Sequence, residues 1–431
     1  MGPALEHLLI KNFRNHGSFE ILDIQSNLVF IGQNGLGKTN LLEAVQLAGT
    51  LESFRSAPWP DLIKAPTVSE PPAAEPWARV EAGFWLAGAL VQTRLEITGQ
   101  GAAFYLNEKK KRRQDMEYKI PMVSFVPDDL QLLKGPAEGR RRYLDDLGKR
   151  LSASYRRLWR DYTKIVRQRN AFLKNLKGCC LVPSLSEEAW NDRLADLGAA
   201  LMVSRTRLFE RLLAEAKGYY ESLSGTEGLD GRYFPSFLRG GQADLESLKS
   251  QAPSVLAEAS TGAPAGIPAE ASTGALAGAD TDTPSSAPLA SSSTGGRPSV
   301  ADQKEEYKQQ LLAALERRRH EEYLRGSTLV GPHRDELDFL ANGQDTRRFS
   351  SQGQQRTIIL ALKFGETRML SQTYGAEPIL LLDDVLSELD GTRRERLLEL
   401  CAGSAQTIIT ATDIAGLPAS AIAESRVIEL F

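Results

Sequence analysis

The sequence is poor in cysteine and in long hydrophobic runs. Its three cysteines, Cys179, Cys180 and Cys401, have neither the spacing of metal ligands nor an even number for a disulfide framework. Purely apolar runs such as 379–382 are far shorter than the roughly 18 residues that a membrane-spanning helix needs. The N-terminus carries charged residues and no apolar core with a cleavage site, so no signal peptide is predicted. These absences argue against a disulfide-rich secreted protein and a membrane protein, and we expect a cytoplasmic location.

An overall excess of positive charge is also missing, because 52 lysines and arginines stand against 55 acidic residues. The basic residues are instead clustered in the first half of the chain. One cluster is a continuous run of Lys109, Lys110, Lys111, Arg112 and Arg113. A second cluster has helical spacing and comprises Arg156, Arg160, Lys164 and Arg167. Such a stripe is either a solvated helix face or a surface for a polyanion.

The length of 431 residues suggests two or three structural units of about 150 residues each. The changing pattern along the chain predicts an α/β part over 1–126, a helical part over 127–325 and a second α/β part over 326–431. Apolar patterns predict strands at 5–10, 19–24, 28–31, 79–85, 91–97, 378–382 and 407–410, and helices at 354–370 and 391–400.

The helical part contains two near-heptad seams, over 155–172 and 190–212, which predict two long helices packed as a hairpin. The composition changes at 252–299, a segment that is nearly all Ala, Gly, Ser, Thr and Pro and contains a repeat with a 12-residue shift. This stretch has too little apolar surface to offset the entropy of ordering it. We therefore predict a disordered insertion, followed by a helix at about 302–324.

A phosphate-binding pattern, G-x-x-x-x-G-K-[ST], is present at every fixed position. Its residues are Gly32, Gln33, Asn34, Gly35, Leu36, Gly37, Lys38 and Thr39. The segment follows an apolar strand and begins a helix, so that backbone N–H groups and the helix dipole can surround phosphate oxygens. Lys38 is predicted to reach the β- and γ-phosphates of ATP and Thr39 to hold Mg²⁺. A glycine-rich turn without a ligand is the alternative.

A phosphate loop needs an acidic partner on a neighbouring strand. Asp383 and Asp384 end the apolar strand at 380–382 and are suited to this role. Asp383 is predicted to be the magnesium carboxylate, and Asp384 to orient the attacking water. The alternative is a surface acidic pair. Because 345 residues separate Lys38 from Asp383, the two ends of the chain must assemble one head, with the helical part projecting between them.

A third segment, Ser350 to Arg356, opens the helix before this strand. A serine with a glycine at a helix N-terminus is either an anion-binding device or an ordinary N-cap.

Together these segments resemble ABC-type ATPases. The phosphate loop resembles the Walker A motif, Ser351–Arg356 the ABC signature, 380–384 the Walker B motif, and 387–390 the D-loop. The split head with a helical insertion is similar to the branch that contains the SMC (structural maintenance of chromosomes) proteins. Within this branch the chain resembles the RecF family through 13–15, 125–130, 141–145, 168–170 and 331–335.

The resemblance implies an α/β, split ABC-type head with an inserted helical arm, and an ATP-dependent homodimer that binds gapped single- and double-stranded DNA. It also implies action with RecR and RecO to load RecA on DNA coated with SSB, and a role in the SOS response. ATP and Mg²⁺ are the implied cofactors. Ser351, with Gly353 and Gln354, would contact the partner subunit's ATP. Arg14 and Asn15 would lie beside the nucleotide, and the D-loop would lie across the dimer interface.

Two departures from the general ABC pattern predict slow hydrolysis. Asp384 stands where most ABC ATPases have Glu, and none of the four histidines follows the last core strand, where residues 410–412 replace the switch histidine. His333 is predicted to have a structural role in a turn. With a dimeric head, the run 109–113 and the helical stripe are hypothesised to line a DNA-binding surface.

Other classes of function fit less well. A nucleotide-binding subunit of a transporter has much closer Walker motifs, and an SMC-like structural tether needs longer coiled coils. A nucleotide-dependent nuclease of the overcoming-lysogenization type needs a further metal-dependent module.

Overall fold

The computed structural model describes residues 2–24, 26–55, 57–65, 75–116, 120–176, 185–226, 228–238, 299–414, 417, 422–423 and 425–431. Cys179, Cys180 and nearly all of the predicted disordered insertion lie outside the described residues. No helix within the described ranges is long and apolar enough to cross a membrane.

The first layer is an antiparallel sheet with the strand order β2-β1-β4-β5-β6-β7. Its strands are β1 (Ala4–Phe13), β2 (His16–Ile21), β4 (Trp77–Leu86), β5 (Ala89–Thr98), β6 (Gly101–Leu106) and β7 (Lys109–Lys111). The strand predicted at 19–24 ends earlier, at Ile21, and Asp23 then adopts a left-handed backbone with a φ of 52°. The basic run at 109–111 forms the outermost strand.

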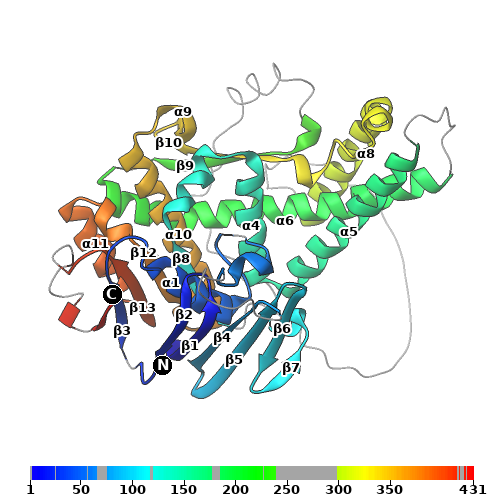
Figure 1. Ribbon diagram of the computed structural model, residues 1–431. Coiled ribbons are helices and arrows are strands. Elements are labelled where there is room, and N and C mark those ends of the chain that lie inside the picture. Colours follow the sequence, from blue (N-terminus) through cyan, green and yellow to red (C-terminus); the bar gives the residue numbers. More distant parts are fainter. Residues whose placement is uncertain are drawn as a thin grey trace, which may run out of the picture.

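The second layer is a parallel sheet with the order β14-β3-β13-β12-β8. Its strands are β3 (Asn27–Ile31), β8 (Met122–Phe125), β12 (Ile379–Asp383), β13 (Gln406–Ala411) and β14 (Ser425–Glu429). The central strands are buried on both faces, which explains their continuous apolar sequences. Strand β3, from the N-terminal part, lies between two strands from the C-terminal part, so the two ends of the chain form one sheet (Figure 1).

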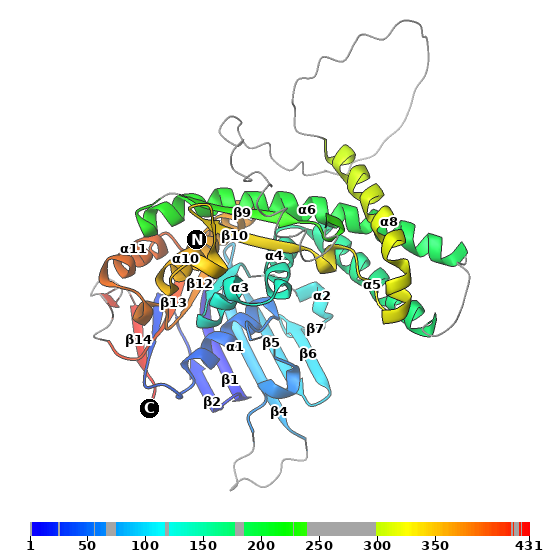
Figure 2. The same ribbon diagram turned by 90° about the horizontal axis from the view of Figure 1, so that it is seen from above.

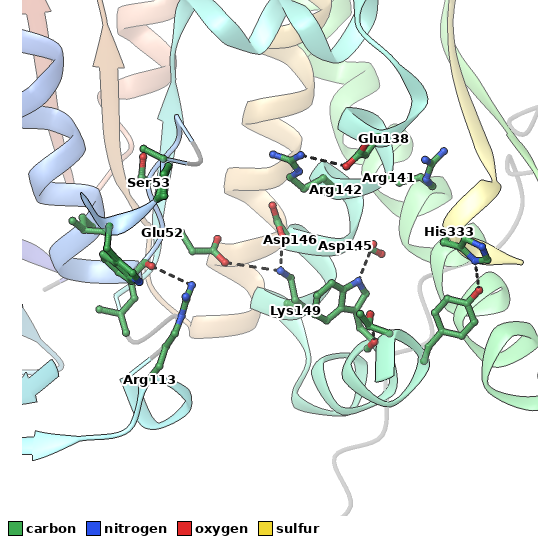
Figure 3. A pocket seen from close by; sticks show the side chains of 18 of the residues that line it. Glu52, Ser53, Arg113, Glu138, Arg141, Arg142, Asp145, Asp146, Lys149 and His333 are labelled. Atoms are coloured by element: carbon green, nitrogen blue, oxygen red, sulfur yellow. Dashed lines mark hydrogen bonds and ion pairs between the residues drawn. The ribbon is translucent and has the colours of Figure 1, made fainter. Parts of the chain in front are cut away.

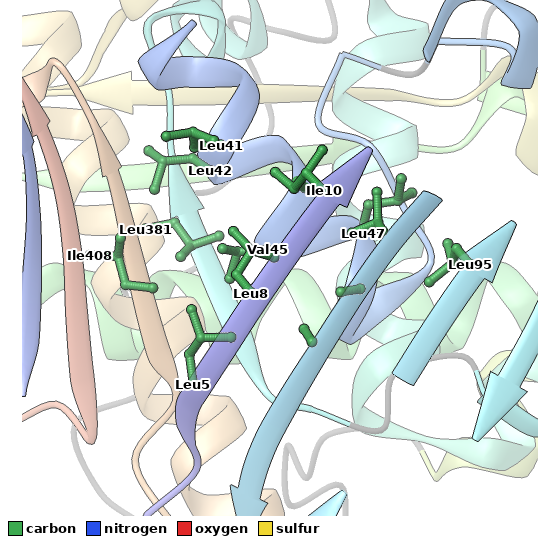
Figure 4. Packing of buried hydrophobic residues seen from close by; sticks show 14 of the residues in the cluster. Leu5, Leu8, Ile10, Leu41, Leu42, Val45, Leu47, Leu95, Leu381 and Ile408 are labelled. Carbon is green, nitrogen blue, oxygen red and sulfur yellow. The ribbon is translucent and has the colours of Figure 1, made fainter. Parts of the chain in front are cut away.

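Helix α1 (Lys38–Thr50) packs between the two sheets. Leu41, Leu42 and Val45 of this helix contact Leu8 of β1 and Leu381 of β12 in one buried cluster (Figure 4). The other face of the parallel sheet packs against α10 (Gln352–Tyr374) and α11 (Gly391–Cys401). The phosphate-loop helix is therefore held on both sides by apolar contacts.

The helical arm consists of α4 (Ala137–Leu151), α5 (Ala153–Leu176), α6 (Leu185–Ser224) and α8 (Val300–Arg325). The predicted pair is α5 and α6, and α8 joins them as a third helix around Tyr162, Leu194 and Leu311 (Figure 2). Two ion pairs, Lys304–Asp196 at 2.7 Å and Lys308–Asp192 at 2.8 Å, connect α8 to α6. The 40 residues of α6 continue from the arm onto α10 of the head.

A small antiparallel sheet of β9 (Leu229–Phe234), β10 (Glu336–Ala341) and β11 (Gln344–Asp345) packs beside α6. The short helices are η1 (Trp59–Leu62), α2 (Arg113–Met116), η2 (Pro127–Leu130), α3 (Gln131–Lys134), η3 (Ser236–Leu238), η4 (Pro332–Arg334), α9 (Thr346–Phe349) and η5 (Val385–Glu388). The domain limits 1–126, 127–325 and 326–431 stay predictions.

Candidate nucleotide-binding site

The phosphate loop joins β3 to α1 through backbone conformations that favour glycine. Gly35 and Gly37 have φ values of 90° and 94°. A Cβ atom at Gly37 would lie 2.4 Å from Oδ1 of Asn15 and 2.5 Å from Nε2 of His16. Glycine is thus required at 37 for both the turn and the close approach of the β1–β2 connection.

Lys38 is the first residue of α1, and its side chain is directed back over the loop. Its Nζ donates to the carbonyl oxygens of Gly32 and of Gln33, the latter at 3.1 Å. The residue is only 6% exposed, whereas Gln33, Asn34 and Gly35 lie at the surface. The cation is therefore held beside an exposed loop, in the place where a phosphate group can replace carbonyl oxygens as its partner.

Asp383 and Thr39 meet although 344 residues separate them. The Thr39 Oγ1 hydroxyl donates to Oδ1 of Asp383 at 2.9 Å, and Thr410 Oγ1 donates to the same oxygen at 2.9 Å. Burial raises the pKa of the Asp383 carboxyl, and the two hydroxyl groups partly oppose that rise. The arrangement joins the predicted Walker A and Walker B residues at the carboxyl edge of the parallel sheet.

Asp384 follows with a left-handed backbone, at a φ of 54°. Its N–H donates to Thr410 Oγ1 at 2.9 Å, while its own Oδ1 is buried and makes no hydrogen bond within the described part of the chain. Thr410 therefore connects both aspartates. Sequence reasoning noticed residue 410 only as the replacement for a switch histidine, although it is the register partner of Asp383 on the adjacent strand β13.

The residues at this edge fit a magnesium ion. Mg²⁺ is bound by oxygen ligands, commonly one or two carboxylates together with substrate phosphates. Thr39 and Asp383 supply a hydroxyl and a carboxylate, and Asp384 adds an unpaired carboxylate oxygen nearby. The described residues contain no group of three or more His, Cys, Asp or Glu side chains able to hold a metal alone.

Arg14 and Asn15 lie beside the phosphate loop, in a hydrogen-bonded cluster that the sequence did not reveal. Buried Glu43 of α1 accepts from Arg14 Nη2 at 2.7 Å and from Arg14 Nε at 2.9 Å. Asn15 accepts from Asn40 at 2.7 Å and donates to the Gly35 carbonyl at 3.4 Å. Glu43 occurs four residues after Thr39 in an otherwise apolar helix. That isolated acid was the one feature of the sequence that could have indicated a buried polar contact here.

The signature segment lies at the surface. Ser351 is exposed and is the N-cap of α10, where its hydroxyl accepts from Gln354 N at 3.3 Å and its N–H donates to Gln354 Oε1 at 2.8 Å. Gly353 follows in the first turn. The geometry is that of a capping box, so within a single copy of the chain Ser351 acts as an N-cap. Exposure also leaves the serine accessible to another molecule.

Ser387 and Asp390 of the D-loop segment are exposed as well, whereas Leu389 is buried. The Ser387 hydroxyl donates to the Asp384 carbonyl at 2.8 Å, and Asp390 is the N-cap of α11, accepting from Arg393 N at 2.9 Å. The Arg393 guanidinium pairs with Asp390 at 2.9 Å.

The predicted DNA-binding residues fall on two separate elements. Lys109, Lys110 and Lys111 are exposed on the edge strand β7, Arg112 follows this strand, and Arg113 begins α2. On α5, three members of the stripe are exposed, whereas Arg156 is half-buried and donates to the Lys149 carbonyl. Their role in binding stays a prediction.

His333 is built into a turn. Its Nδ1 lies 2.7 Å from the Tyr162 hydroxyl and its Nε2 lies 3.1 Å from the Thr328 carbonyl oxygen. Burial lowers the pKa of His333 to about 4. These contacts agree with the predicted structural role.

Comparison with known proteins places the whole chain in one group. The family described as "RecF/RecN/SMC N terminal domain" matches residues 4–418. The DNA replication and repair protein RecF of Microcystis aeruginosa is 31% identical over 432 residues, which cover 98% of this chain and 97% of that protein. RecF of Chloroflexus aggregans is 33% identical over 438 residues, covering 98% and 96%.

A solved structure described as the recombination mediator protein RecF–ATP in the RecFOR pathway has a TM-score of 0.75 to this chain, at 24% sequence identity. The match covers 97% of this chain and 94% of that one. The fold class predicted from the sequence, an α/β split head with a helical insertion, is thereby confirmed.

Proposed function

Because this chain belongs to the RecF family, we propose that it is an ATP-dependent DNA-binding protein of replication and recombinational repair. The observation that carries the proposal is the hydrogen bond between Thr39 and Asp383. It unites a phosphate loop and an acidic strand end from opposite ends of the chain in one site.

The proposed chemistry of this site is ATP binding with slow hydrolysis. The loop N–H groups and Lys38 would hold the phosphates, while Thr39 and Asp383 would hold Mg²⁺, which neutralises charge on the phosphate oxygens. Asp384 would orient the attacking water. Its side chain is one methylene shorter than the usual glutamate, and no histidine stands at 410–412 after the last core strand, which supports slow turnover.

We propose that a second copy of the chain completes the site. Ser351, Gly353 and Gln354 would contact the partner's ATP, and the D-loop would line the interface. Support comes from the exposure of Ser351, whose side-chain contacts lie within its own helical turn. An exposed helix N-terminus presents N–H groups and a positive dipole end to an anion.

The proposed ligand of the dimer is gapped DNA, with single- and double-stranded parts. The exposed lysines of β7 and the exposed stripe on α5 supply positive charge without sequence readout. By relationship to the family, the proposed partners are RecR and RecO, the proposed outcome is loading of RecA on SSB-coated DNA with a role in the SOS response, and the proposed location is cytoplasmic.

Sizing measurements with ATP, ADP and no nucleotide test this proposal. The wild type is expected to dimerise on DNA when ATP is present, and to stay monomeric with ADP or without nucleotide. Lys38→Ala should lose nucleotide binding, whereas Ser351→Arg should bind ATP as a monomer. A wild-type protein that stays monomeric on DNA at saturating ATP would contradict the proposal.

A further inference from the structure

A large cleft separates the head from the base of the arm. It has a volume of about 710 Å³ and lies between η1 with the end of α1 on one side and α4, α5 and η4 on the other (Figure 3). Helix α1 connects it to the nucleotide site, because Lys38 begins that helix in the phosphate loop and Leu47 near its end lines the cleft. At 13 residues the helix is about 20 Å long, so this head–arm cleft is a separate site.

Two segments that resemble the RecF family, but take no part in the nucleotide site, meet at this cleft. Arg141–Asp145 lies on α4 and 331–335 includes η4, and side chains from both line the cleft. Two contacts hold this region together. Arg141 Nη1 donates to the Asp335 carbonyl at 2.6 Å, which joins the two segments directly. Arg205 of α6 pairs with Asp145 of the first segment at 2.8 Å.

The acids of the cleft already have cationic partners. Asp146 pairs with Lys149 at 2.5 Å and Glu138 with Arg142 at 3.7 Å, as Figure 3 shows. Arg205 neutralises Asp145. Glu52, the fourth acid of the lining, lies 3.9 Å from the same Lys149. Six lysine and arginine side chains line the cleft against four carboxylates, so its net charge favours an anion.

Two cations of the cleft have no such partner. Neither Arg141 nor Arg334 forms an ion pair within the described part of the chain. Arg141 is half-buried; its burial and the neighbouring Arg205 lower its pKa, and the charges of Asp335, Glu336 and Glu138 partly oppose that fall. A partly desolvated guanidinium with no directly paired carboxylate can accept an anion, and its planar fork suits a phosphate group.

The cleft also has aromatic walls. Trp59 of η1 and Trp159 of α5 line the cleft, and both indoles are half-buried. One cation lies over each ring, Arg113 at 5.8 Å from the Trp59 centroid and Lys149 at 4.7 Å from the Trp159 centroid, so a base would stack beside a positive charge. Cations combined with aromatic side chains in a groove are the usual means of holding an unpaired nucleic-acid strand, whose bases stack while its phosphates are neutralised. The volume suits a ligand of one or two nucleotides and not a double helix.

The cleft is continuous with both predicted DNA-binding elements. Arg113, which ends the basic run, lines one rim, and Thr163 of α5 lines the other, next to Lys164 of the stripe. A strand lying in the cleft would thus continue onto positive surface at either side.

We propose that the head–arm cleft binds an unpaired DNA strand, with Arg141 and Arg334 neutralising its phosphates and the two indoles available to its bases. This inference rests on the proposed DNA-binding function and names where the single-stranded part of the DNA lies.

With the phosphate-loop site saturated by ATP, the test compares binding of a 20-nucleotide single strand, a blunt duplex, a deoxynucleoside monophosphate and an acidic peptide, at several salt concentrations. Arg141→Ala/Arg334→Ala should bind the single strand about tenfold or more weakly, with the salt slope reduced by about 1.4, because two phosphate contacts are lost. Affinities for the duplex and for ATP should change less than about twofold, which is the small effect expected from removing an exposed charge that does not contact the ligand. Weak binding of the mononucleotide would identify the strand, not a free nucleotide, as the ligand.

The matched control is Arg193→Ala/Arg325→Ala, which removes two exposed arginines of the arm outside the cleft. Because Arg141 is half-buried, the single variant Arg334→Glu, at an exposed position, serves if the double variant fails to fold. The double variant Arg141→Lys/Arg334→Lys keeps both positive charges and should retain most of the wild-type affinity for the single strand. Unchanged single-strand binding, or an equal loss for single strand and duplex, would overturn the cleft assignment alone. Tight mononucleotide binding or binding of an acidic peptide in place of DNA would also overturn it. A wild type that binds no DNA would overturn the proposed function as well.

Discussion

The two halves of the proposed nucleotide site differ in how far this one chain completes them. Around the phosphate loop, Thr39, Asp383 and Thr410 are connected by hydrogen bonds of 2.9 Å, with Asp383 and Thr410 buried and Thr39 half-buried. Around the signature, Ser351 is exposed, and its hydrogen bonds to Gln354 and Gln355 lie within its own helical turn. The comparison indicates that folding assembles one half within this chain, and the proposed contact with a second copy would complete the other.

The comparison can be tested most severely at Lys38. Lys38→Ala removes the cation beside the loop, and ATP affinity should fall about 100-fold, because charge-assisted hydrogen bonds to phosphate are lost. Equilibrium binding of a fluorescent ATP analogue measures this. Lys11→Ala, at an exposed position on β1, is the control and should leave affinity unchanged. Equal ATP affinities of Lys38→Ala and wild type would contradict the proposal that the phosphate loop binds ATP.

Thr410 tests whether the closed half depends on its internal connections. Thr410→Val removes the hydroxyl that donates to Asp383 and accepts from the Asp384 N–H. The buried groups lose their partner, so the free energy of unfolding should fall by about 1–3 kcal/mol. Thr410→Ser keeps the hydroxyl and should retain most of the stability in urea unfolding. A valine variant as stable as wild type would show that the bridge contributes little.

Ser351 separates the two interpretations of the open half. Ser351→Ala removes the N-cap and should destabilise the protein by about 1 kcal/mol, whereas Ser351→Asn keeps a good cap. If the serine also contacts a partner's ATP, both variants should weaken ATP-dependent dimerisation while only the alanine lowers the melting temperature. Normal dimerisation of both variants would leave Ser351 with a capping role alone.

The smallest expected effect is a pH dependence at Asp383. Its pKa is raised in the folded state, so its contribution to stability falls as the pH rises above the unfolded value of about 3.9. Without Mg²⁺, Asp383→Asn should therefore gain stability relative to wild type as the pH increases through the raised pKa. Thermal unfolding between pH 4 and pH 8 in chelator measures the difference. An opposite slope would contradict the burial argument.

Local patterns predicted the motif-bearing elements well, because the phosphate loop, the apolar strand before Asp383 and the cap at Ser351 are each encoded by neighbouring residues. The separation of Lys38 from Asp383 also predicted that the chain's ends share one head, and the order β3-β13-β12 explains how.

Long-range contacts were not predictable in the same way. Thr410 reaches Asp383 only because β13 and β12 are in parallel register, and Glu43 reaches Arg14 only because α1 packs against the end of β1. The early end of β2 depends on the left-handed turn at Asp23, for which the sequence offers no glycine. The head–arm cleft arises from α4 and η4, whose residues lie nearly 200 positions apart.

A mixing experiment tests the half-complete site most directly. Lys38→Ala retains a signature but lacks a working loop, and Ser351→Arg retains the loop but lacks the signature. Each variant alone should stay monomeric with a non-hydrolysable ATP analogue in sedimentation velocity. Their equal mixture should form heterodimers with one bound nucleotide, built from the loop of one variant and the signature of the other. A mixture that stays monomeric, or Ser351→Arg dimerising alone, would contradict the account.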